Sequence, residues 1–445
     1  MSFSNKIENL FKKFLPAPFT IAVLLTFLTF TLALVLTESN ENSSHFFTIL
    51  TYWEQGFWDN KLLVFAMQMM LMLVLGHTLA LTKSVNQIIV KATAYCSSTS
   101  KAAAIITFFT IIVALFNWGL GLIFGAIFAR KVGEHATREK IKLNYPLIGA
   151  CGYSGLMVWH GGISGSAPIK IAESGHFLEQ KTGIISQSET IFSTMNISVS
   201  LALIIILPLI MFFIGKKNEG SIVNIKIHEE ETKIKIVKNL DHSSIISLIF
   251  GSLILLSSFY NIFIGPENIS LKFLTPNYIN LLLLGLAIIM HKNIYSFLKA
   301  IDKAIHGASG ILIQFPIYFG IMGIMNYSGM VEMMSELFVN ISNKDTFPIL
   351  TFISGGIVNI FVPSGGGQWA VQGPIIVESA IKLGVSIPKC VMALAYGDQL
   401  TNMLQPFWAL PLLGITGLKA SEILPYTLIF MGAGAVIFIF GLLFF

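Results

Sequence analysis

The sequence predicts an all-α polytopic membrane protein built from two repeats of inverted topology, each with a re-entrant helical hairpin and a broken helix. Of its 445 residues, 54% are hydrophobic and 11% are charged, whereas about 25% of the residues of a soluble globular protein are charged. The charges in the loops and a correspondence between the two halves of the sequence predict the rest of this architecture.

Four segments without Asp, Glu, Lys or Arg are the clearest membrane spans, because each is near the roughly 20 residues that a helix needs to cross a bilayer. They are residues 19–36, 62–82, 197–214 and 423–445. Five more crossings are expected near 143–169, 243–260, 276–291, 307–328 and 389–413. The first apolar segment is too long for a signal peptide and no cleavage site follows it, so we interpret it as an uncleaved helix.

The positions of Lys and Arg predict the orientation, because cytoplasmic loops are rich in these residues. Lys6, Lys12 and Lys13 precede the first span, which places the N-terminus in the cytoplasm. The next loop is acidic, and the loop after it is again rich in Lys. With nine crossings, the C-terminus is expected on the extracytoplasmic side.

Two charge-free segments, 102–129 and 346–377, are too short for two crossings, which need about 40 residues. A single crossing by the first would place the basic cluster at 130–142 outside. We therefore interpret 102–129 as a re-entrant hairpin from the cytoplasm, broken at "FNWGLG" (116–121). By the same reasoning, 346–377 is a hairpin from outside, broken at "PSGGG" (363–367).

The two halves also correspond around the broken helices expected at about 145–169 and 389–413. "ACGYSGLMVWHGGISGSAP" begins at Ala150, and "ALAYGDQLTNMLQPFWALP" begins at Ala393. Both segments begin with Ala and have Tyr at the fourth position and Pro at the nineteenth. The match indicates an internal repeat.

A pair of asparagines extends this correspondence upstream. Asn117 lies 36 residues before Tyr153, and Asn359 lies 37 residues before Tyr396, each at the expected break of a hairpin. Because the hairpins start from opposite sides, the repeats have inverted topology, and their discontinuous helices are expected to meet near the midplane. The predicted parts are an N-terminal repeat, a cytoplasmic linker and a C-terminal repeat, at 1–214, 215–242 and 243–445.

The helix breaks are the candidate substrate site, because non-helical backbone inside a bilayer must be buried in protein or line a wet cavity. Glycine allows a ligand to approach the main chain, and a helix that starts after a break directs N–H groups at an anion. The broken segments contain no Lys or Arg, which suits one carboxylate better than two, although helix N-termini can hold two. The alternative is a set of tight turns between packed helices. The candidate residues are Ser164, Gly165, Ser166, Ser364, Gly365, Gly366, Gly367, Gln368 and Asn402.

A second set of residues is expected to couple an ion or to shape the site. Asp398 is the only carboxylate in the broken segments, and acids inside a membrane are costly and usually functional. It is a candidate proton carrier or cation ligand, or alternatively a helix cap. His160 is a candidate for proton transfer, because histidine is the residue type that changes charge near neutral pH, or alternatively a structural hydrogen-bonding group. The full set is Asn117, Gly119, His160, Asn359 and Asp398.

Other features of the sequence bear on ligands and partners. No cofactor and no metal beyond Na⁺ is expected, because the three cysteines lack the spacing of metal ligands. The net charge of +5 lies in loops, so no nucleic-acid partner is expected. Four tryptophans at the breaks either form the wall of an apolar pocket or simply pack: Trp118, Trp159, Trp369 and Trp408.

These motifs resemble the bacterial short-chain fatty acid transporter family of the AtoE type, from the first helix to the C-terminus. The resemblance rests on "GGISGSAP", "VPSGGGQWAVQGP", "AYGDQLTNMLQPFWALP", "NKDTFP" and "QGFWDNKLLVFAMQM". It implies the fold of the ion-transporter superfamily, elevator-type motion and uptake of monocarboxylates such as butyrate or acetoacetate through a bacterial inner membrane. Coupling to H⁺ or Na⁺ and a homodimer are also expected.

This chain departs from the expected family pattern at three positions. Some members are expected to carry His at 368, Glu at 398 and Gly at 160, where this chain has Gln368, Asp398 and His160. An essential proton carrier at position 368 is therefore not expected here.

Three rival functions are weighed against short-chain fatty acid transport. Two are transport functions of the same superfamily, a C4-dicarboxylate carrier and a Na⁺/H⁺ antiporter. The third is a membrane-embedded enzyme. The sequence argues against the enzyme, because it has no HExxH, no GxSxG and no paired carboxylates in the apolar segments.

Overall fold

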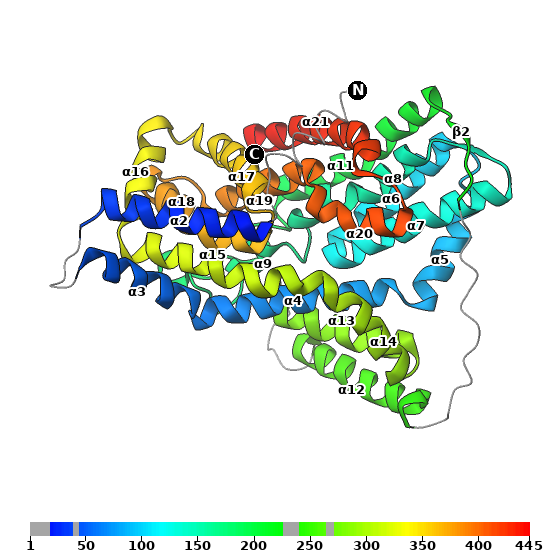
Figure 1. Ribbon diagram of the computed structural model, residues 1–445, viewed down its shortest axis with the longest axis horizontal. Coiled ribbons are helices and arrows are strands. Elements are labelled where there is room, and N and C mark those ends of the chain that lie inside the picture. The colour runs from blue at the N-terminus through cyan, green and yellow to red at the C-terminus, as the bar shows by residue number, and fades with distance from the viewer. Residues whose placement is uncertain (1–17, 39–43, 226–239, 264–270) are drawn as a thin grey trace.

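The computed structural model describes residues 18–38, 44–225, 240–263 and 271–445, which are almost entirely helical (Figure 1). In these ranges the only strands are β1 (Lys142–Leu143) and β2 (Ser221–Ile222), which pair antiparallel. The lysines at 6, 12 and 13, and residues 226–239 of the predicted linker at 215–242, lie outside the described residues.

The helices form two layers (Figure 1). In the first, which we call the framework layer, α15 packs against α2, α3 and α4, and α13 packs against α4 and α12. Its helices are α2 (Pro18–Leu36), α3 (His45–Phe57), α4 (Asn60–Ala80), α12 (Ser244–Phe263), α13 (Pro276–His291), α14 (Ile294–Ile305) and α15 (Ser309–Tyr327).

The second, which we call the hairpin layer, holds both predicted hairpins and both broken helices. Here α6 packs against α7 and α11, and α17 packs against α19. Its main helices are α6 (Thr99–Phe116), α7 (Trp118–Arg138), α8 (Tyr145–Tyr153), α9 (Ser166–Ile171), α11 (Thr194–Lys217), α17 (Phe347–Phe361), α18 (Gly365–Leu383), α19 (Ile387–Thr401), α20 (Pro406–Thr416) and α21 (Ala420–Phe444).

Shorter elements complete the chain. The helix α5 (Lys83–Thr93) packs on α7, and α16 (Met330–Ile341) packs on α15 and α18. The helix α10 (Glu179–Thr182) lies between α9 and α11. The 3₁₀ turns are η1 (Ser154–Met157), η2 (Trp159–Gly161), η3 (Leu240–His242), η4 (Leu271–Phe273), η5 (His306–Ala308) and η6 (Asn402–Leu404).

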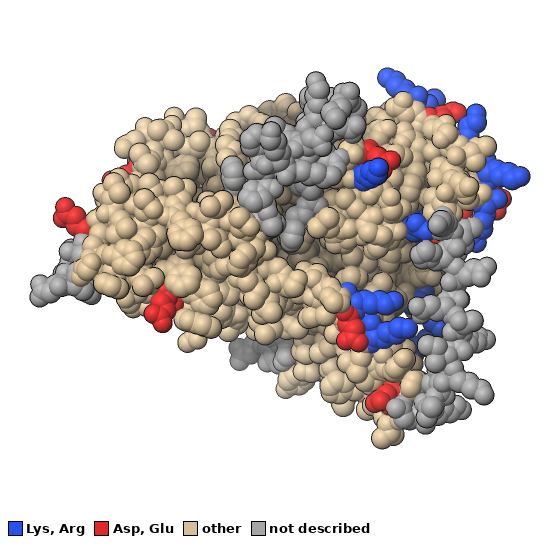
Figure 2. Space-filling model, in the orientation of Figure 1, with Lys and Arg blue, Asp and Glu red and all other residues tan. Residues whose placement is uncertain are grey.

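The surface of the molecule is that of a multi-pass membrane protein. Six of the described helical segments are long and apolar enough to cross a membrane. Large apolar side chains are exposed along the outer helices, for example Phe27 at 66% and Leu253 at 59%. Figure 2 shows Lys and Arg gathered at one end of this broad uncharged surface. Lipid is the environment that makes such exposure favourable.

Four helices lie where the sequence predicted loops: α3, α5, α14 and α16. They were missed because the predicted spans were uncharged stretches, whereas these helices carry charges on one face. In α14, for example, Lys299, Asp302 and Lys303 accompany an apolar face that buries Phe297 and Ala300. An amphipathic helix of this kind packs on its neighbours through one stripe. The helix α11 also continues to Lys217, beyond the predicted boundary at 214.

Both hairpins break close to the predicted residues. Between α6 and α7 the backbone of Asn117 is extended, and its side-chain oxygen accepts the N–H of Leu120 at 2.7 Å. Between α17 and α18 the break contains Pro363, and the hydroxyl of Ser364 accepts the N–H of Gly367 at 3.2 Å. Each cap satisfies one of the free N–H groups at the start of a helix.

Asn359 does not lie at the break, contrary to the sequence interpretation. It is inside α17, two residues before the helix ends at Phe361. The cap equivalent to Asn117 is Ser364, because the second break is centred on Pro363, whose ring fixes its backbone and lacks an N–H.

Candidate functional site

A narrow cavity lies between the two layers, where the second break of the hairpin layer faces α4 and α15. The volume within which the centre of a water-sized sphere can move is about 20 Å³. This is room for about one water molecule. The described residues that line it are Met69, Leu156, Ser166, Ile311, Phe315, Ser364, Gly365, Gly366, Asn402 and the tryptophans Trp118, Trp159 and Trp408.

Five of the nine predicted substrate-binding residues line this cavity: Ser166, Ser364, Gly365, Gly366 and Asn402. The other four lie next to it and have structural partners. They are Ser164, Gly165, Gly367 and Gln368.

The contacts of these four residues are local. The Ser164 hydroxyl accepts the N–H of Trp118 at 3.0 Å. Gly165 precedes α9, where an added Cβ would lie 2.1 Å from the carbonyl oxygen of His160. The N–H of Gly367 donates to Ser364. The Gln368 amide nitrogen donates to the carbonyl oxygen of Gly355 at 2.8 Å, so this side chain is held against α17.

The N-terminus of α18 presents backbone donors to the cavity. The N–H groups of Gly367 and Gln368 both donate to Ser364. The N–H groups of Gly365 and Gly366 have no acceptor within the described ranges, and they begin a helix of 19 residues. A helix N-terminus carries partial positive charge, so an anion is favoured here.

Only glycine fits at the first two positions of α18. A Cβ at Gly365 would lie 2.6 Å from the Trp159 ring and 2.9 Å from the His160 ring. A Cβ at Gly366 would lie 2.9 Å from the Phe315 ring. The absence of side chains leaves the backbone open between these rings.

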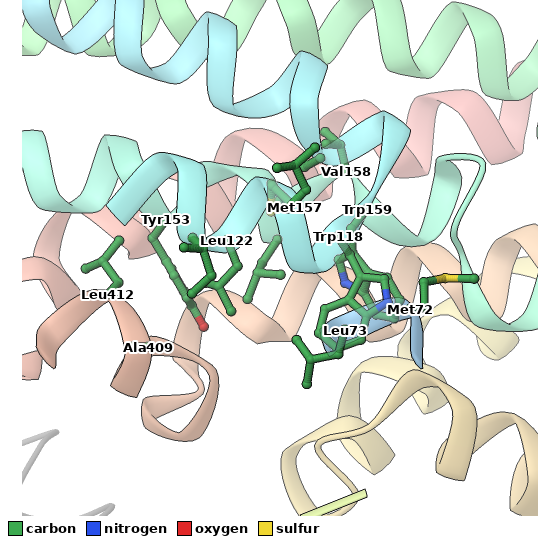
Figure 3. Close-up of a cluster of buried hydrophobic side chains, with 14 of the residues drawn as sticks. Met72, Leu73, Trp118, Leu122, Tyr153, Met157, Val158, Trp159, Ala409 and Leu412 are labelled. Atoms are coloured by element: carbon green, nitrogen blue, oxygen red, sulfur yellow. The ribbon is translucent and has the colours of Figure 1, made fainter. Parts of the chain in front are cut away.

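The wall opposite these donors is aromatic. The ring centroid of Trp118 is 5.7 Å from that of Trp159 and 5.4 Å from that of Trp408. Figure 3 shows Trp118 and Trp159 beside Met72 and Leu73 of α4. Trp369 is fully buried in a separate apolar cluster and does not line the cavity.

His160 and Asp398 form a buried pair behind this wall. His160 stacks on Trp159 at 4.4 Å between ring centroids, and its Nδ1 is 3.1 Å from Oδ1 of Asp398. The N–H of Ala167 donates to Nε2 of His160 at 3.0 Å. Because a backbone N–H can only donate, Nε2 is an acceptor and Nδ1 carries the hydrogen. His160 is therefore a neutral imidazole that donates to Asp398.

Asn359 joins the second hairpin to the second broken helix. Its amide nitrogen lies 2.8 Å from the carbonyl oxygen of Asp398, 2.9 Å from the Thr401 hydroxyl and 3.0 Å from the side-chain oxygen of Asn402. The predicted residues Asn359, Asp398 and Asn402 therefore belong to one cluster. Asn117 and Gly119 lie at the other hairpin, where an added Cβ on Gly119 would be 3.0 Å from Leu73.

Several buried polar atoms of this cluster lack partners within the described part of the chain. They are Oδ2 of Asp398, Oδ1 of Asn359, Oε1 of Gln368 and Nδ2 of Asn402. Buried polar atoms without protein partners are rare, and many of them bind water or an ion.

Two tyrosines that the sequence only matched as landmarks connect the broken helices. The Tyr153 hydroxyl donates to the carbonyl oxygen of Asn402 at 2.9 Å. The Tyr396 hydroxyl donates to Oδ1 of Asn196 at 2.9 Å, and the amide nitrogen of Asn196 donates to the carbonyl oxygen of Gly161 at 2.8 Å. Each tyrosine is thus linked to the break in the other half of the chain.

Sequence reasoning missed a buried ion pair one helical turn beyond Ser166. Nζ of Lys170 is 2.6 Å from Glu173 and 3.3 Å from the side-chain oxygen of Gln68 on α4. Gln68 in turn donates to Glu173 at 2.7 Å. We call these three residues the Lys170 cluster. Its sequence signals are a Lys and a Glu three residues apart after "GSAP", and a Gln in an apolar span.

Replacing Lys170 by Met is expected to lower the thermal stability in detergent substantially, because it leaves the largely buried carboxylate of Glu173 without its cation. Removing one partner of a buried pair costs about 3–5 kcal/mol. The double variant Lys170→Met with Glu173→Gln should recover part of the loss. The control is Lys181→Gln in a more exposed ion pair with Glu378, which should cost about 1 kcal/mol or less. Equal stability of Lys170→Met and wild type would contradict this assignment.

Comparison with known proteins identifies the family. A profile of the family described as short chain fatty acid transporter matches residues 2–445. A protein of Escherichia coli K12 named "Putative short-chain fatty acid transporter" is 37% identical over 448 residues, which are 99% of this chain and 98% of the relative. A protein of the same name from Haemophilus influenzae is 36% identical over 457 residues, 99% of each chain.

Two solved structures share the fold at low sequence identity. One is the YdaH transporter of Alcanivorax borkumensis, with a TM-score of 0.54, 12% identity and coverage of 96% of this chain and 98% of that chain. The other is MtrF of Neisseria gonorrhoeae, described among antimetabolite efflux pumps, with a TM-score of 0.54, 14% identity and coverage of 98% and 97%. The family profile and the two relatives confirm the resemblance seen in the motifs: the chain belongs to the short-chain fatty acid transporter family.

Proposed function

We propose that this protein is a secondary active transporter that carries short-chain monocarboxylates, such as butyrate or acetoacetate, across the bacterial inner membrane. The observation that supports it most is the cavity itself. It joins backbone and amide donors on one side to a wall of tryptophan rings on the other, and the described residues that line it include no Lys or Arg.

In this proposal the carboxylate binds at the start of α18. The N–H groups of Gly365 and Gly366 and the unpartnered amide nitrogen of Asn402 are the donors. The Ser364 hydroxyl adds another, and the Ser166 hydroxyl, which donates to Sδ of Met69 at 3.4 Å, is a further donor if it turns toward the carboxylate. One negative charge suits this set of dipoles, whereas a dicarboxylate would favour an Arg.

The acyl chain then lies against Trp118, Trp159 and Trp408. Burial of each CH₂ contributes about 0.8 kcal/mol, so the length of the enclosed wall determines the preferred chain length. The small volume of the cavity suits an acid of few carbons once the two layers separate slightly around it.

Coupling to H⁺ or Na⁺ is proposed at the cluster behind the wall. A buried carboxylate with one unpartnered oxygen is costly unless a proton, a water or a cation meets it. Asp398 has such an oxygen, and Asn359 contributes another unpartnered acceptor close by. The hydrogen bond to Asp398 gives His160 a positioning role.

Inverted repeats and elevator-type motion are part of the same proposal. The crossed links of Tyr153 and Tyr396 to the opposite breaks support the pairing of the halves. The division into a framework layer and a hairpin layer supports movement of one past the other. Lys and Arg at one end of the molecule (Figure 2) support an orientation with that end and the N-terminus in the cytoplasm, and the C-terminus outside.

Uptake of labelled butyrate into proteoliposomes, under H⁺ and Na⁺ gradients imposed separately, tests this function. Wild-type protein should accumulate butyrate with one of the gradients. The variant Ser364→Ala with Gly366→Ala should lose at least about tenfold in uptake, because a Cβ at 366 meets Phe315. The control Ser188→Ala, in an exposed loop, should behave as wild type. Absence of wild-type uptake would reject the function, and unchanged uptake by the double variant would reject only the site.

The same liposomes separate the rival transport functions. Succinate should compete poorly with butyrate if the site holds one carboxylate, whereas strong competition would favour a C4-dicarboxylate carrier. Proton flux that depends on Na⁺ in the absence of any organic acid would favour an antiporter. Chemical analysis of the recovered acid would reveal turnover by an enzyme.

Replacing Trp408 by Ala is expected to shift the preference toward longer acids. Two additional CH₂ groups in the enlarged pocket contribute about 1.6 kcal/mol, so the ratio of hexanoate to butyrate uptake should rise on the order of tenfold. The control is Trp58→Ala, whose side chain is 62% exposed. An unchanged ratio in the Trp408 variant would show that this ring does not contact the acyl chain.

A further inference from the structure

A second, basic pocket lies far from the hairpin breaks along the helix axis of α4. The volume within which the centre of a water-sized sphere can move is about 370 Å³ in this pocket. The end of α4, the start of α5, the end of α13 and the helix α14 form its walls. The residues that line it are Leu81, Lys83, Met290, His291, Lys292, Asn293, Ser296, Lys299, Ala300 and Lys303.

The pocket concentrates positive charge. Four of its ten lining residues are lysines, and none is Asp or Glu. Among the described residues, no carboxylate lies within ion-pair distance of Lys83, Lys292 or Lys303. The neighbouring acid on α14, Asp302, is not part of the lining. Lysines that line one pocket repel one another, so an anion bound between them would be stabilised.

The walls of the pocket are fixed in place without any ligand. Nε2 of His291, at the end of α13, donates to the carbonyl oxygen of Thr78 on α4 at 2.9 Å. Asn293 caps α14 by accepting the N–H of Ser296 at 2.8 Å. The backbone of Lys292, which lies between His291 and Asn293, is therefore held by contacts on both sides.

The helix α14 has the properties of a helix at the membrane surface. Its side chains Phe297, Ala300 and Ala304 are buried against the molecule. A separate stripe is exposed and apolar, with Tyr295 at 46%, Leu298 at 51% and Ile305 at 50%. The two pocket lysines of α14, Lys299 and Lys303, lie on a third face. Helices of this kind lie in the headgroup region with the apolar stripe toward the acyl chains.

We propose that this pocket binds the headgroup of an anionic phospholipid, with the lysines around its phosphate. Leu81, Met290 and Ala300 give the pocket an apolar floor, which suits the glycerol and first acyl carbons of a lipid better than a free ion. Basic pockets between membrane helices on the cytoplasmic side are typical sites for such headgroups. Figure 2 shows Lys and Arg side chains gathered at this end of the molecule.

Native mass spectrometry of the whole protein, purified from micelles that contain phosphatidylglycerol, tests the proposal. We expect wild-type protein to retain phosphatidylglycerol in preference to phosphatidylcholine. The variant Lys83→Gln, Lys292→Gln and Lys303→Gln should bind it at least about tenfold more weakly, since each lysine near a membrane surface adds severalfold to lipid affinity. The single variant Lys292→Gln should show a smaller loss and serves if the triple variant fails to fold.

The matched control removes three lysines elsewhere: Lys91→Gln, Lys101→Gln and Lys140→Gln. It should retain phosphatidylglycerol as wild type does. An equal loss in the two triple variants would overturn the proposal, because it would indicate diffuse attraction by the basic end. Equal retention of phosphatidylcholine, or displacement of the lipid by millimolar inorganic phosphate, would also overturn it.

Discussion

Replacing Asp398 by Asn is expected to abolish uptake driven by an ion gradient while leaving the protein folded. Asn keeps the shape of the side chain and an oxygen that accepts the hydrogen of His160 Nδ1, now 3.1 Å from Asp398. It removes the negative charge that a proton or a cation would neutralise. Gradient-driven butyrate uptake should therefore fall at least about tenfold, which corresponds to about 1.4 kcal/mol.

Counterflow exchange, with butyrate on both sides and no ion gradient, separates coupling from binding. The Asp398→Asn variant should retain exchange, because the donors at Gly365 and Gly366 are untouched. The control Glu332→Gln changes an exposed acid at the surface and should behave as wild type in both assays. Full uptake by Asp398→Asn, with its dependence on the gradient intact, would exclude Asp398 as the coupling group.

The variant His160→Ala should fail in a different way. It leaves the N–H of Ala167 and Oδ1 of Asp398 without partners, and each buried unpaired group costs about 1–3 kcal/mol. We therefore expect a lower unfolding temperature together with the loss of uptake. A variant that keeps stability and loses only coupling, such as Asp398→Asn, is the more informative of the two.

The helix breaks were predictable because their causes are local. Asn117 and Ser364 cap the helices that follow them, and both cap signals lie within a few residues of the break. Pro363 lacks a backbone N–H and is followed at once by the cap residue Ser364, so a helix end is expected there. The uncharged spans were predictable for the same reason, since length and composition alone decide them. The prediction that Asn359 lies at a helix break, as Asn117 does, was wrong. The two asparagines lie in different local sequences, and in the second hairpin Pro363 and Ser364 form the break.

The residues that line the cavity could be predicted only in part. Whether a side chain lines the cavity depends on the direction in which it points and on contacts with residues distant in sequence. Gln368 follows Ser364 by one turn, yet its amide is held by Gly355 on the preceding helix. Lys170 is buried because Gln68, 102 positions away in sequence, lies opposite it. The residues themselves can be noticed in the sequence, but a single sequence does not show that they face each other. The amphipathic helices were likewise missed, since their burial depends on the neighbours that cover one stripe.

Replacing Gly76 by Ala is expected to have the second large effect, because this glycine of α4 lies directly against the break between α6 and α7. An added Cβ would lie 2.1 Å from Oδ1 of Asn117 and 2.8 Å from the backbone nitrogen of Leu120. These two atoms form the cap of α7. The methyl group would therefore push α4 away from the break or break the cap.

The cost should be large because both partners are held rigidly. Asn117 is fully buried, and Gly119 of the same hairpin lies against Leu73 of α4, so neither side can withdraw alone. Overpacking of this kind costs about 1–3 kcal/mol, and loss of a cap adds about 1 kcal/mol. We expect an unfolding temperature lower by several degrees and butyrate uptake reduced at least about tenfold.

The matched control is Gly432→Ala in α21, where no atom lies within 4 Å of an added Cβ. Ala is the better helix former, so this variant should be as stable as wild type or slightly more stable. If the hairpin layer moves past α4 during transport, the contact at Gly76 exists in only one of the two arrangements. The Gly76→Ala variant would then bind butyrate in the other arrangement but could not complete the transport cycle. We therefore expect it to bind butyrate while its uptake is lost. Loss of both to the same degree would show instead that the contact only stabilises the fold.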